Sequence, residues 1–186
     1  MAAVNSPLPA LFFVTDPRVE DPRAVAKTLP RSSAIIYRHF GNTCRAEIAA
    51  DLRAIAFDGD HLFLIGADPQ LAMCCGADGV HFPQRDISSV AKWRELIPQW
   101  FLSAAVHDMD SIIEANAAPL NAVTLSPVFQ TDSTGSGKPL GARRFTDLAG
   151  LSSYPVIAMG GIKPENIDHL SGTGAAAIAG ISLFIN

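Results

Sequence analysis

The sequence lacks the features that mark membrane, secreted and nucleic-acid-binding proteins. It has three cysteines, a net charge of −4, and only short apolar runs. A membrane span needs about 20 apolar residues, and a nucleic-acid partner usually requires a basic face. We therefore expect no membrane association and no nucleic-acid partner. The N-terminal segment has no basic start typical of a signal peptide, and an odd cysteine count fits a reducing compartment, so we expect a cytoplasmic protein.

The chain has 186 residues, of which 48% are hydrophobic, which is enough to bury one large core. We therefore treat residues 1–186 as a single domain. Short apolar runs rich in β-forming residues recur along the chain, and helix-like segments lie between them. The expected strands are 10–16, 34–39, 61–67, 79–83, 101–106, 122–128, 155–161 and 175–182. The expected helices are 20–29, 43–57, 69–76, 87–97, 108–118, 143–151 and 164–171.

Eight strands alternating with helices predict an α/β fold, the (β/α)8 TIM barrel, with a doubly wound open sheet as the alternative. The chain is short for a barrel, for which about 250 residues is typical. It also stops at Asn186, directly after the eighth strand, so we expect the eighth helix to be absent or truncated. The outer face of that strand would then need another cover, which a homodimer would supply.

Glycines close the seventh and eighth expected strands. Gly160 and Gly161 end the seventh, and Gly180 with Ile181 and Ser182 ends the eighth. In TIM barrels, phosphate often binds after these two strands. Free backbone N–H groups there, with a helix beginning at Pro164, would bind an anion without a basic side chain. The alternative is that the glycines only make tight turns.

Polar residues also follow the other expected strands, which places them at the same end of the barrel. His107 ends a strand and precedes a helix, so it is a candidate proton-transfer group. His81 fits a structural role better, and no short-range ligand pair supports a zinc site. The loop 130–144 is rich in Gly, Ser and Thr and is a candidate binding loop. The polar residues at this end are Thr15, Asp16, Arg38, His39, Asp68, His81, Asp86, His107, Ser126, Thr131 and Asp132.

Several stretches resemble the family of thiamin phosphate synthase and its relative, the thiazole tautomerase. GADGVHFPQRD is similar to the family's GADGVHLGQED, and PVIAMGGIKPEN is similar to PVvAIGGInpeN. LFFVTD, LNAVTLSPVFQT and GAAAIAGIS resemble its other strand regions. The resemblance implies a TIM barrel and a transferase of thiamin biosynthesis. That enzyme couples hydroxymethylpyrimidine diphosphate to thiazole phosphate with Mg²⁺ and releases diphosphate.

The resemblance also implies roles for individual residues. Arg38 matches the arginine that contacts diphosphate, and Asp86 matches a Mg²⁺-binding aspartate. His107 matches the proton-transfer histidine of the tautomerase. Backbone groups near Gly160 and Gly161 would hold the thiazole phosphate. Further matches or candidates for the phosphate groups are Ile181, Ser182, Thr131, Ser133 and His39.

Other family positions differ, mainly those for metal and diphosphate. The family's Asn-Asp pair reads Gly66-Ala67, with Asp68 one residue later as a candidate substitute metal ligand, and a family lysine is Phe40. Lys138 is displaced by an insertion. Three hypotheses stay open: a divergent synthase in which Asp68, His39 and Lys138 take over the missing roles, a tautomerase that uses His107, and a non-catalytic binder of thiazole or thiamin phosphate. In each, the partners are small phosphorylated molecules.

Overall fold

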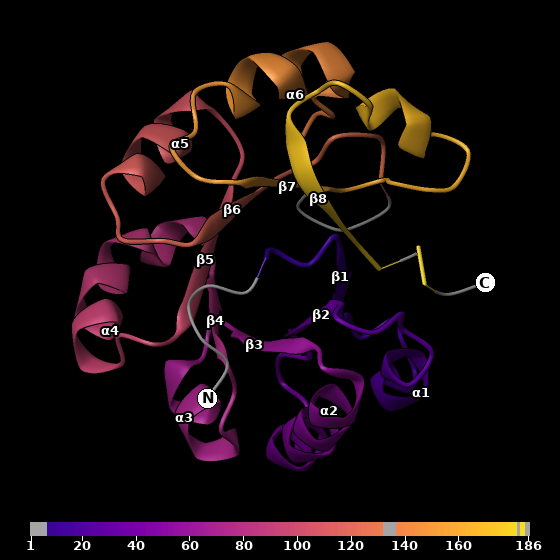
Figure 1. Ribbon diagram of the computed structural model, residues 1–186, viewed down its shortest axis with the longest axis vertical. Coiled ribbons are helices and arrows are strands. Elements are labelled where there is room, and N and C mark those ends of the chain that lie inside the picture. The colour runs from indigo at the N-terminus through magenta and orange to yellow at the C-terminus, as the bar shows by residue number, and fades with distance from the viewer. Residues whose placement is uncertain (1–6, 132–136, 182, 185–186) are drawn as a thin grey trace.

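The fold is a closed barrel of eight parallel strands. We describe residues 7–131, 137–181, 183 and 184 from a computed structural model. Strands follow one another around the barrel in chain order, and β8 pairs with β1 to close it (Figure 1). The closing pair confirms the predicted barrel and excludes the open sheet, whose edge strands would not pair.

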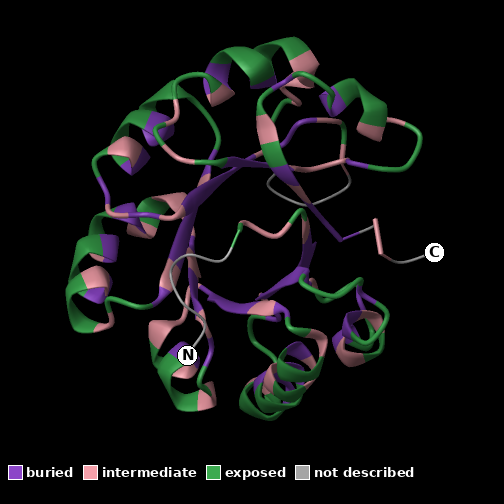
Figure 2. Cartoon of the chain, viewed as in Figure 1, coloured by how far each residue is buried: buried purple, intermediate pink, exposed green. Residues whose placement is uncertain are grey.

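Each strand lies within its expected range, because short apolar runs buried on both faces suit a parallel sheet covered by helices. Buried residues accordingly line the ring of strands, and exposed residues lie on the outer helices (Figure 2). The strands are β1 Leu11–Val14, β2 Ala34–Tyr37, β3 Leu62–Gly66, β4 Gly79–Phe82, β5 Phe101–Val106, β6 Ala122–Leu125, β7 Val156–Met159 and β8 Ala175–Gly180.

Capping residues fix the starts of several helices. Asp68 accepts a hydrogen bond from the N–H of Leu71, and Asp108 forms a capping box with Ser111. The helices are α1 Pro22–Ala26, α2 Arg45–Gly59, α3 Pro69–Cys75, α4 Val90–Leu96, α5 Met109–Asn116 and α6 Gly141–Ala149. The 3₁₀ helices are η1 Gln84–Ser89 and η2 Ile167–Leu170.

The prediction of a seventh α-helix over 164–171 is wrong. Pro164 to Asn166 form a turn, in which the Asn166 side chain accepts a hydrogen bond from the N–H of Lys163, and only the short η2 follows. The backbone N–H groups of His169 and Ser171 donate to the carbonyls three residues earlier, those of Asn166 and Asp168, which is the 3₁₀ pattern and not the α-helical one. No α-helix N-terminus therefore faces the glycines after β7.

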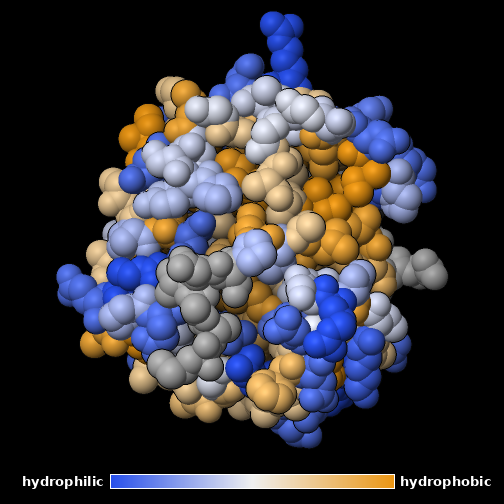
Figure 3. Space-filling model, in the orientation of Figure 1, coloured by the Kyte–Doolittle hydropathy of each residue, from blue (hydrophilic) through white to orange (hydrophobic). Residues whose placement is uncertain are grey.

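The ring of helices is open beside β8 (Figure 1). Among the described residues that follow β8, none is helical. Phe184 packs edge-on against Phe13 of β1, with ring centroids 5.5 Å apart, and so covers part of this region. Figure 3 shows an apolar area over β8. The homodimer that would cover it stays a prediction. Within the part of the chain described, no helix is long and apolar enough to cross a bilayer.

Candidate active site

A small hollow lies where β7 and β8 end. Its volume is about 30 Å³, and we call it the glycine hollow. It brings together segments that are far apart in the sequence, since parallel strands all end on the same side of the barrel. Its lining residues are Arg18, Thr131, Met159, Gly160, Gly161, Ile162, Gly180 and Ile181.

Gly160 and Gly161 are required by the backbone itself. Both have positive φ, 98° and 65°, and a Cβ on Gly161 would lie 2.3 Å from the carbonyl oxygen of Gln130. The segment after β6 therefore packs directly on them, and the N–H of Phe129 donates to the Gly160 carbonyl. The tight-turn explanation is thus sufficient for the two glycines.

The same geometry leaves donors available for a ligand. None of the hydrogen bonds described for this part of the chain uses the N–H of Gly161, Ile162 or Ile181. All three residues line the glycine hollow. Converging backbone N–H groups can bind an anion without a helix N-terminus. A tight turn at the two glycines and an anion site beside them are therefore compatible.

Arg18 is a residue of this hollow that sequence analysis missed. Its Nε donates to Asp16 Oδ1 at 2.6 Å. Burial raises the pKa of Asp16, but the hydrogen bonds and charge of Arg18 outweigh it, so the pKa is lowered overall. The sequence could have indicated Arg18, because it lies four residues after the end of β1, as other candidate residues follow their strands. Thr131, a candidate for phosphate binding, lines the hollow, whereas Asp132, Ser133 and Ser182 fall outside the described residues.

His107 lies at the end of β5 with its ring exposed. Its Nδ1 is 2.8 Å from the Ser126 carbonyl oxygen, which can only accept, so Nδ1 carries the proton. In the neutral ring, Nε2 is then the nitrogen that can take a proton. His107 lines a second hollow of about 620 Å³, the His107 hollow, together with Lys138 and Arg144. The geometry suits a proton-transfer group beside a cationic surface.

His81 lies at the same end of the barrel as His107, and its ring is neutral at pH 7. Its Nδ1 is 3.0 Å from the Ser103 hydroxyl oxygen, which links β4 to β5. Burial, followed by the charges of Arg38 and His107, lowers the pKa of His81 to about 3. This agrees with the structural role expected for His81. The electrostatic effects also place Arg38, His81 and His107 near one another.

Arg38 and His39 are consecutive but have different surroundings. Burial lowers the pKa of Arg38, and the charge of Asp16 opposes this, so its guanidinium stays charged at neutral pH. His39 is buried, with Nε2 3.2 Å from the Val19 carbonyl oxygen and Nδ1 2.9 Å from the Thr15 hydroxyl. Both ring nitrogens therefore hold the loop after β1. His39, expected to contact phosphate, is better explained as a structural residue.

The two carboxylates expected to bind metal also differ. Asp68 caps α3 and forms an ion pair with Arg45, so both its oxygens are engaged. The Asp86 side chain is 41% exposed, and its ion pair with Arg85 is long, at 3.8 Å. Within the described residues, no group of three His, Cys, Asp or Glu side chains could hold a metal ion. Mg²⁺ often uses only one or two carboxylates with substrate phosphates and water, so Asp86 fits this role and Asp68 does not.

Comparison with known proteins decides the family. The model of a family described as thiamine monophosphate synthase matches residues 11–184. The chain belongs to the thiamine monophosphate synthase family. This confirms the resemblance read from the sequence and makes a transferase of thiamin biosynthesis the supported enzyme class.

Individual relatives named as thiamine-phosphate synthases support this family assignment. The putative thiamine-phosphate synthase 2 of Aquifex aeolicus is 29% identical over 185 residues, which cover 96% of this chain and 98% of that protein. The thiamine-phosphate synthase of Methanoregula boonei is 34% identical over 144 residues, which cover 76% of this chain and 65% of that protein. The chain therefore spans only about two thirds of that second relative.

Solved structures support the same fold. The thiamine phosphate pyrophosphorylase from Pyrococcus furiosus has a TM-score of 0.80 and 27% identity, covering 92% of this chain and 85% of that one. The YdjI aldolase from Escherichia coli has a TM-score of 0.68 at 13% identity, and that likeness shows the barrel alone.

Proposed function

We propose that this chain is a thiamine-phosphate synthase. It would couple hydroxymethylpyrimidine diphosphate to thiazole phosphate. The bond between the pyrimidine methylene carbon and the diphosphate oxygen breaks, and diphosphate leaves with the electron pair. The lone pair of the thiazole nitrogen then forms the new carbon–nitrogen bond. The reaction needs a site for each phosphorylated group and a fixed distance between them.

The observation that carries this proposal is the glycine hollow. The N–H groups of Gly161, Ile162 and Ile181, which make no hydrogen bond among those between described residues, would donate to the thiazole phosphate, and Arg18 adds a positive charge. A cluster of backbone donors suits a phosphate monoester, since each charge-assisted hydrogen bond contributes about 1.5–3 kcal/mol. The acceptor would thus be anchored after β7 and β8.

The diphosphate would lie on the other side of the barrel opening, near Arg38 and Asp86. Arg38 would bind diphosphate oxygens and stabilise the negative charge that develops as they leave. Asp86 would hold Mg²⁺, which when bound neutralises diphosphate charge. The engagement of Asp68 with Arg45 leaves a single carboxylate for the metal. We therefore expect weak Mg²⁺ binding in the absence of diphosphate.

A second candidate function rests on His107. The Ser126 carbonyl fixes its tautomer and leaves Nε2 to exchange a proton, which an isomerase acting on thiazole phosphate would need. Lys138, expected as a substitute diphosphate ligand, lines the hollow beside His107. A binder without catalysis would use the glycine hollow alone. In all three cases the ligand is a small phosphorylated molecule.

One assay separates these functions. The protein is incubated with the pyrimidine diphosphate, thiazole phosphate and Mg²⁺, and thiamin phosphate is followed by mass spectrometry. A synthase gives product, which stops on addition of a chelator. Arg38→Met and Asp86→Asn should lower the rate at least 100-fold, whereas Asp58→Asn, at an exposed position on α2, should leave it unchanged. Absence of product from the wild-type protein would overturn the synthase proposal.

The isomerase alternative has its own test. His107→Gln removes the proton-transfer nitrogen and retains an amide at that position. If the protein interconverts thiazole phosphate isomers, this variant should abolish the conversion without any effect of Mg²⁺. Binding of thiazole phosphate with neither coupling nor isomerisation would instead support the non-catalytic binder.

A further inference from the structure

Phe40 is a large apolar side chain left exposed at the active-site end of the barrel. It follows β2 by three residues, and it is 53% exposed. The Cζ atoms of Arg38 and Arg45 lie 5.9 Å and 5.5 Å from its ring centroid, within the range of cation–π contacts. An exposed ring with two guanidinium groups in cation–π range differs from an isolated apolar side chain on a surface.

The surroundings hold this ring in place. Arg45 donates from Nη2 to the Gly66 carbonyl at 3.1 Å and pairs with Asp68, and its side chain is only 15% exposed. Arg45 is thus anchored to the end of β3 and to the start of α3. Its cation–π contact holds Phe40 in one orientation, which lowers the entropy lost when a ligand covers the ring.

Gly66 provides the space that this arrangement needs. A Cβ on Gly66 would lie 3.0 Å from Arg38 Cγ and 3.6 Å from Phe40 Cζ. The first distance is too short for ordinary packing, so a side chain at position 66 would displace Arg38. The absence of a side chain on Gly66 therefore lets the arginine and the aromatic ring lie across the end of β3 together.

We infer that Phe40 is a specificity-determining residue whose ring stacks on the pyrimidine of the diphosphate substrate. This inference rests on the proposed function. Arg38 provides a charge for diphosphate, and Phe40 provides an apolar face beside it. A ligand with a flat heteroaromatic ring one methylene away from a diphosphate matches both features. Inorganic diphosphate matches only the first.

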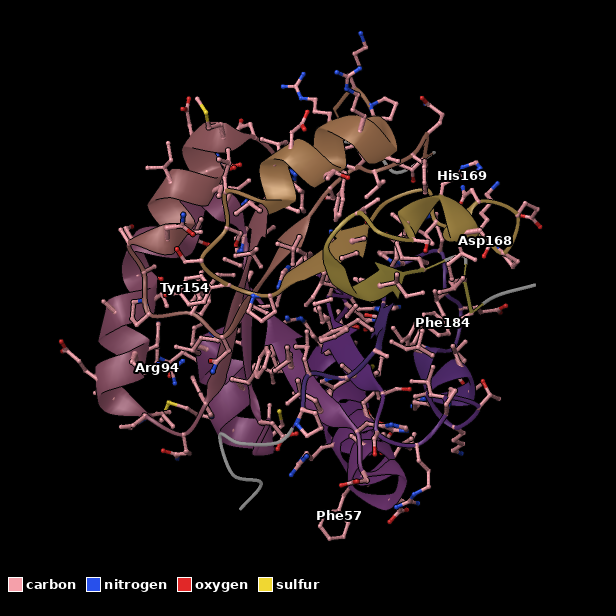
Figure 4. All side chains as sticks on the ribbon, turned by 45° about the horizontal axis from the view of Figure 1, so that its top comes forward. Phe57, Arg94, Tyr154, Asp168, His169 and Phe184 are labelled. Atoms are coloured by element: carbon pink, nitrogen blue, oxygen red, sulfur yellow. The ribbon has the colours of Figure 1, made fainter. Side chains whose placement is uncertain are left out.

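Phe57 shows what an exposed phenylalanine without such surroundings looks like. It is 77% exposed near the end of α2, and Figure 4 shows it projecting into solvent away from the barrel. Of the cation–π contacts among the described residues, none involves Phe57. Phe57→Leu is therefore the matched control for Phe40→Leu, because both replace an exposed ring with an aliphatic side chain.

The test is calorimetric binding of two probes, the pyrimidine diphosphate and inorganic diphosphate, each with Mg²⁺ and without thiazole phosphate. Phe40→Leu should weaken binding of the pyrimidine diphosphate about threefold to tenfold, the usual range for an aromatic contact. Binding of inorganic diphosphate should not change. Phe40→Tyr, which keeps the ring, and Phe57→Leu should both bind like the wild-type protein.

Three results would overturn the inference: equal weakening of both probes by Phe40→Leu, no weakening of either, or no binding of the pyrimidine diphosphate to the wild-type protein. Turnover is measured separately. If the wild-type protein turns over but Phe40→Leu weakens both probes equally or neither, the stacking role is rejected and the synthase proposal stands. If Phe40→Leu weakens only the pyrimidine diphosphate but the wild-type protein does not turn over, the synthase proposal is rejected and Phe40 remains a ring-binding residue.

Discussion

The two ends of the barrel use arginine differently. At the end where β5 and β6 begin, Arg94 donates to the carbonyl oxygens of Pro98, Trp100 and Pro119 and to the side-chain oxygen of Asn121. At the opposite end, Arg38 shows no side-chain hydrogen bond among those described and contacts the exposed ring of Phe40. One arginine is saturated by the protein, and the other can bind a ligand.

The different use of arginine suggests that one end of the barrel serves mainly stability and the other mainly ligand binding. Arg94 ties α4 to the loops before β5 and β6, and Tyr154, on the same side of the molecule in Figure 4, adds a hydrogen bond to Ala118. Conversely, among the hydrogen bonds between described residues, none uses the N–H of Gly161, Ile162 or Ile181 at the glycine hollow. Changes at the first end should alter unfolding, and changes at the second should alter binding.

The largest effect on stability is expected from Arg94→Met. The substitution keeps the apolar stem but removes the donor to the carbonyls of Trp100 and Pro119, neither of which is at an exposed position. Such a loss costs about 3 kcal/mol of unfolding free energy. Denaturant unfolding should show this decrease, while turnover at 25 °C is retained. Arg23→Met, which breaks exposed ion pairs with Asp21 and Asp51, is the control and should change stability much less. Similar losses in the two variants would contradict the structural role of Arg94.

Gly161→Ala should affect both stability and binding. The new Cβ would overlap the Gln130 carbonyl in addition to adopting a positive φ. Gly172→Ala is the matched control, since Gly172 also has positive φ, 72°, but nothing lies within 4 Å of the added Cβ. We expect about 1 kcal/mol of destabilisation at Gly172 and about 2–3 kcal/mol at Gly161.

Binding separates these two glycine variants further. Because Gly161 N–H lines the glycine hollow, Gly161→Ala should weaken thiazole phosphate binding at least tenfold, as measured by calorimetry. Gly172→Ala should bind it like the wild-type protein. Normal binding by Gly161→Ala would mean that the phosphate lies elsewhere.

The barrel could be predicted from the sequence because its signals are local. Each strand is a short apolar run, and residues such as Asp108 mark helix starts within a few positions. The region 164–171 misled this approach: Pro164 and Glu165 are typical of a helix start, yet only a turn and the short η2 form there. The backbone closes hydrogen bonds over three residues, such as that from the N–H of His169 to the Asn166 carbonyl, and a favourable local composition does not extend them into an α-helix.

The site was less predictable because its chemistry depends on contacts between distant segments. His39 and Asp68 follow strands as functional residues do, but their partners, Val19 and Arg45, lie about 20 residues away in the chain. The relation of Gly66 to Phe40 is also non-local. Strand ends therefore indicated where the site lies, and the tertiary hydrogen bonds distinguished structural from available groups.

One further expected stability effect depends on pH and involves His81. Its pKa is about 3 in the folded protein and about 6.5 when unfolded. The unfolded chain therefore binds a proton below pH 6.5 that the folded protein rejects. His81 thus favours folding less as pH falls from 6.5 towards 3. Between pH 7.5 and 4.5, this loss should be a little under 3 kcal/mol, at about 1.4 kcal/mol per pH unit below 6.5.

Denaturant unfolding of His81→Asn across this pH range tests the effect. Asparagine keeps a polar group near the Ser103 hydroxyl but does not titrate, so the variant should lose about 2.5 kcal/mol less than the wild type on acidification. His169→Asn, at an exposed position in η2, should keep the wild-type pH dependence. Parallel pH profiles for wild type and His81→Asn would show that His81 can accept a proton in the folded barrel. It could then share the proton-transfer role now given to His107 alone.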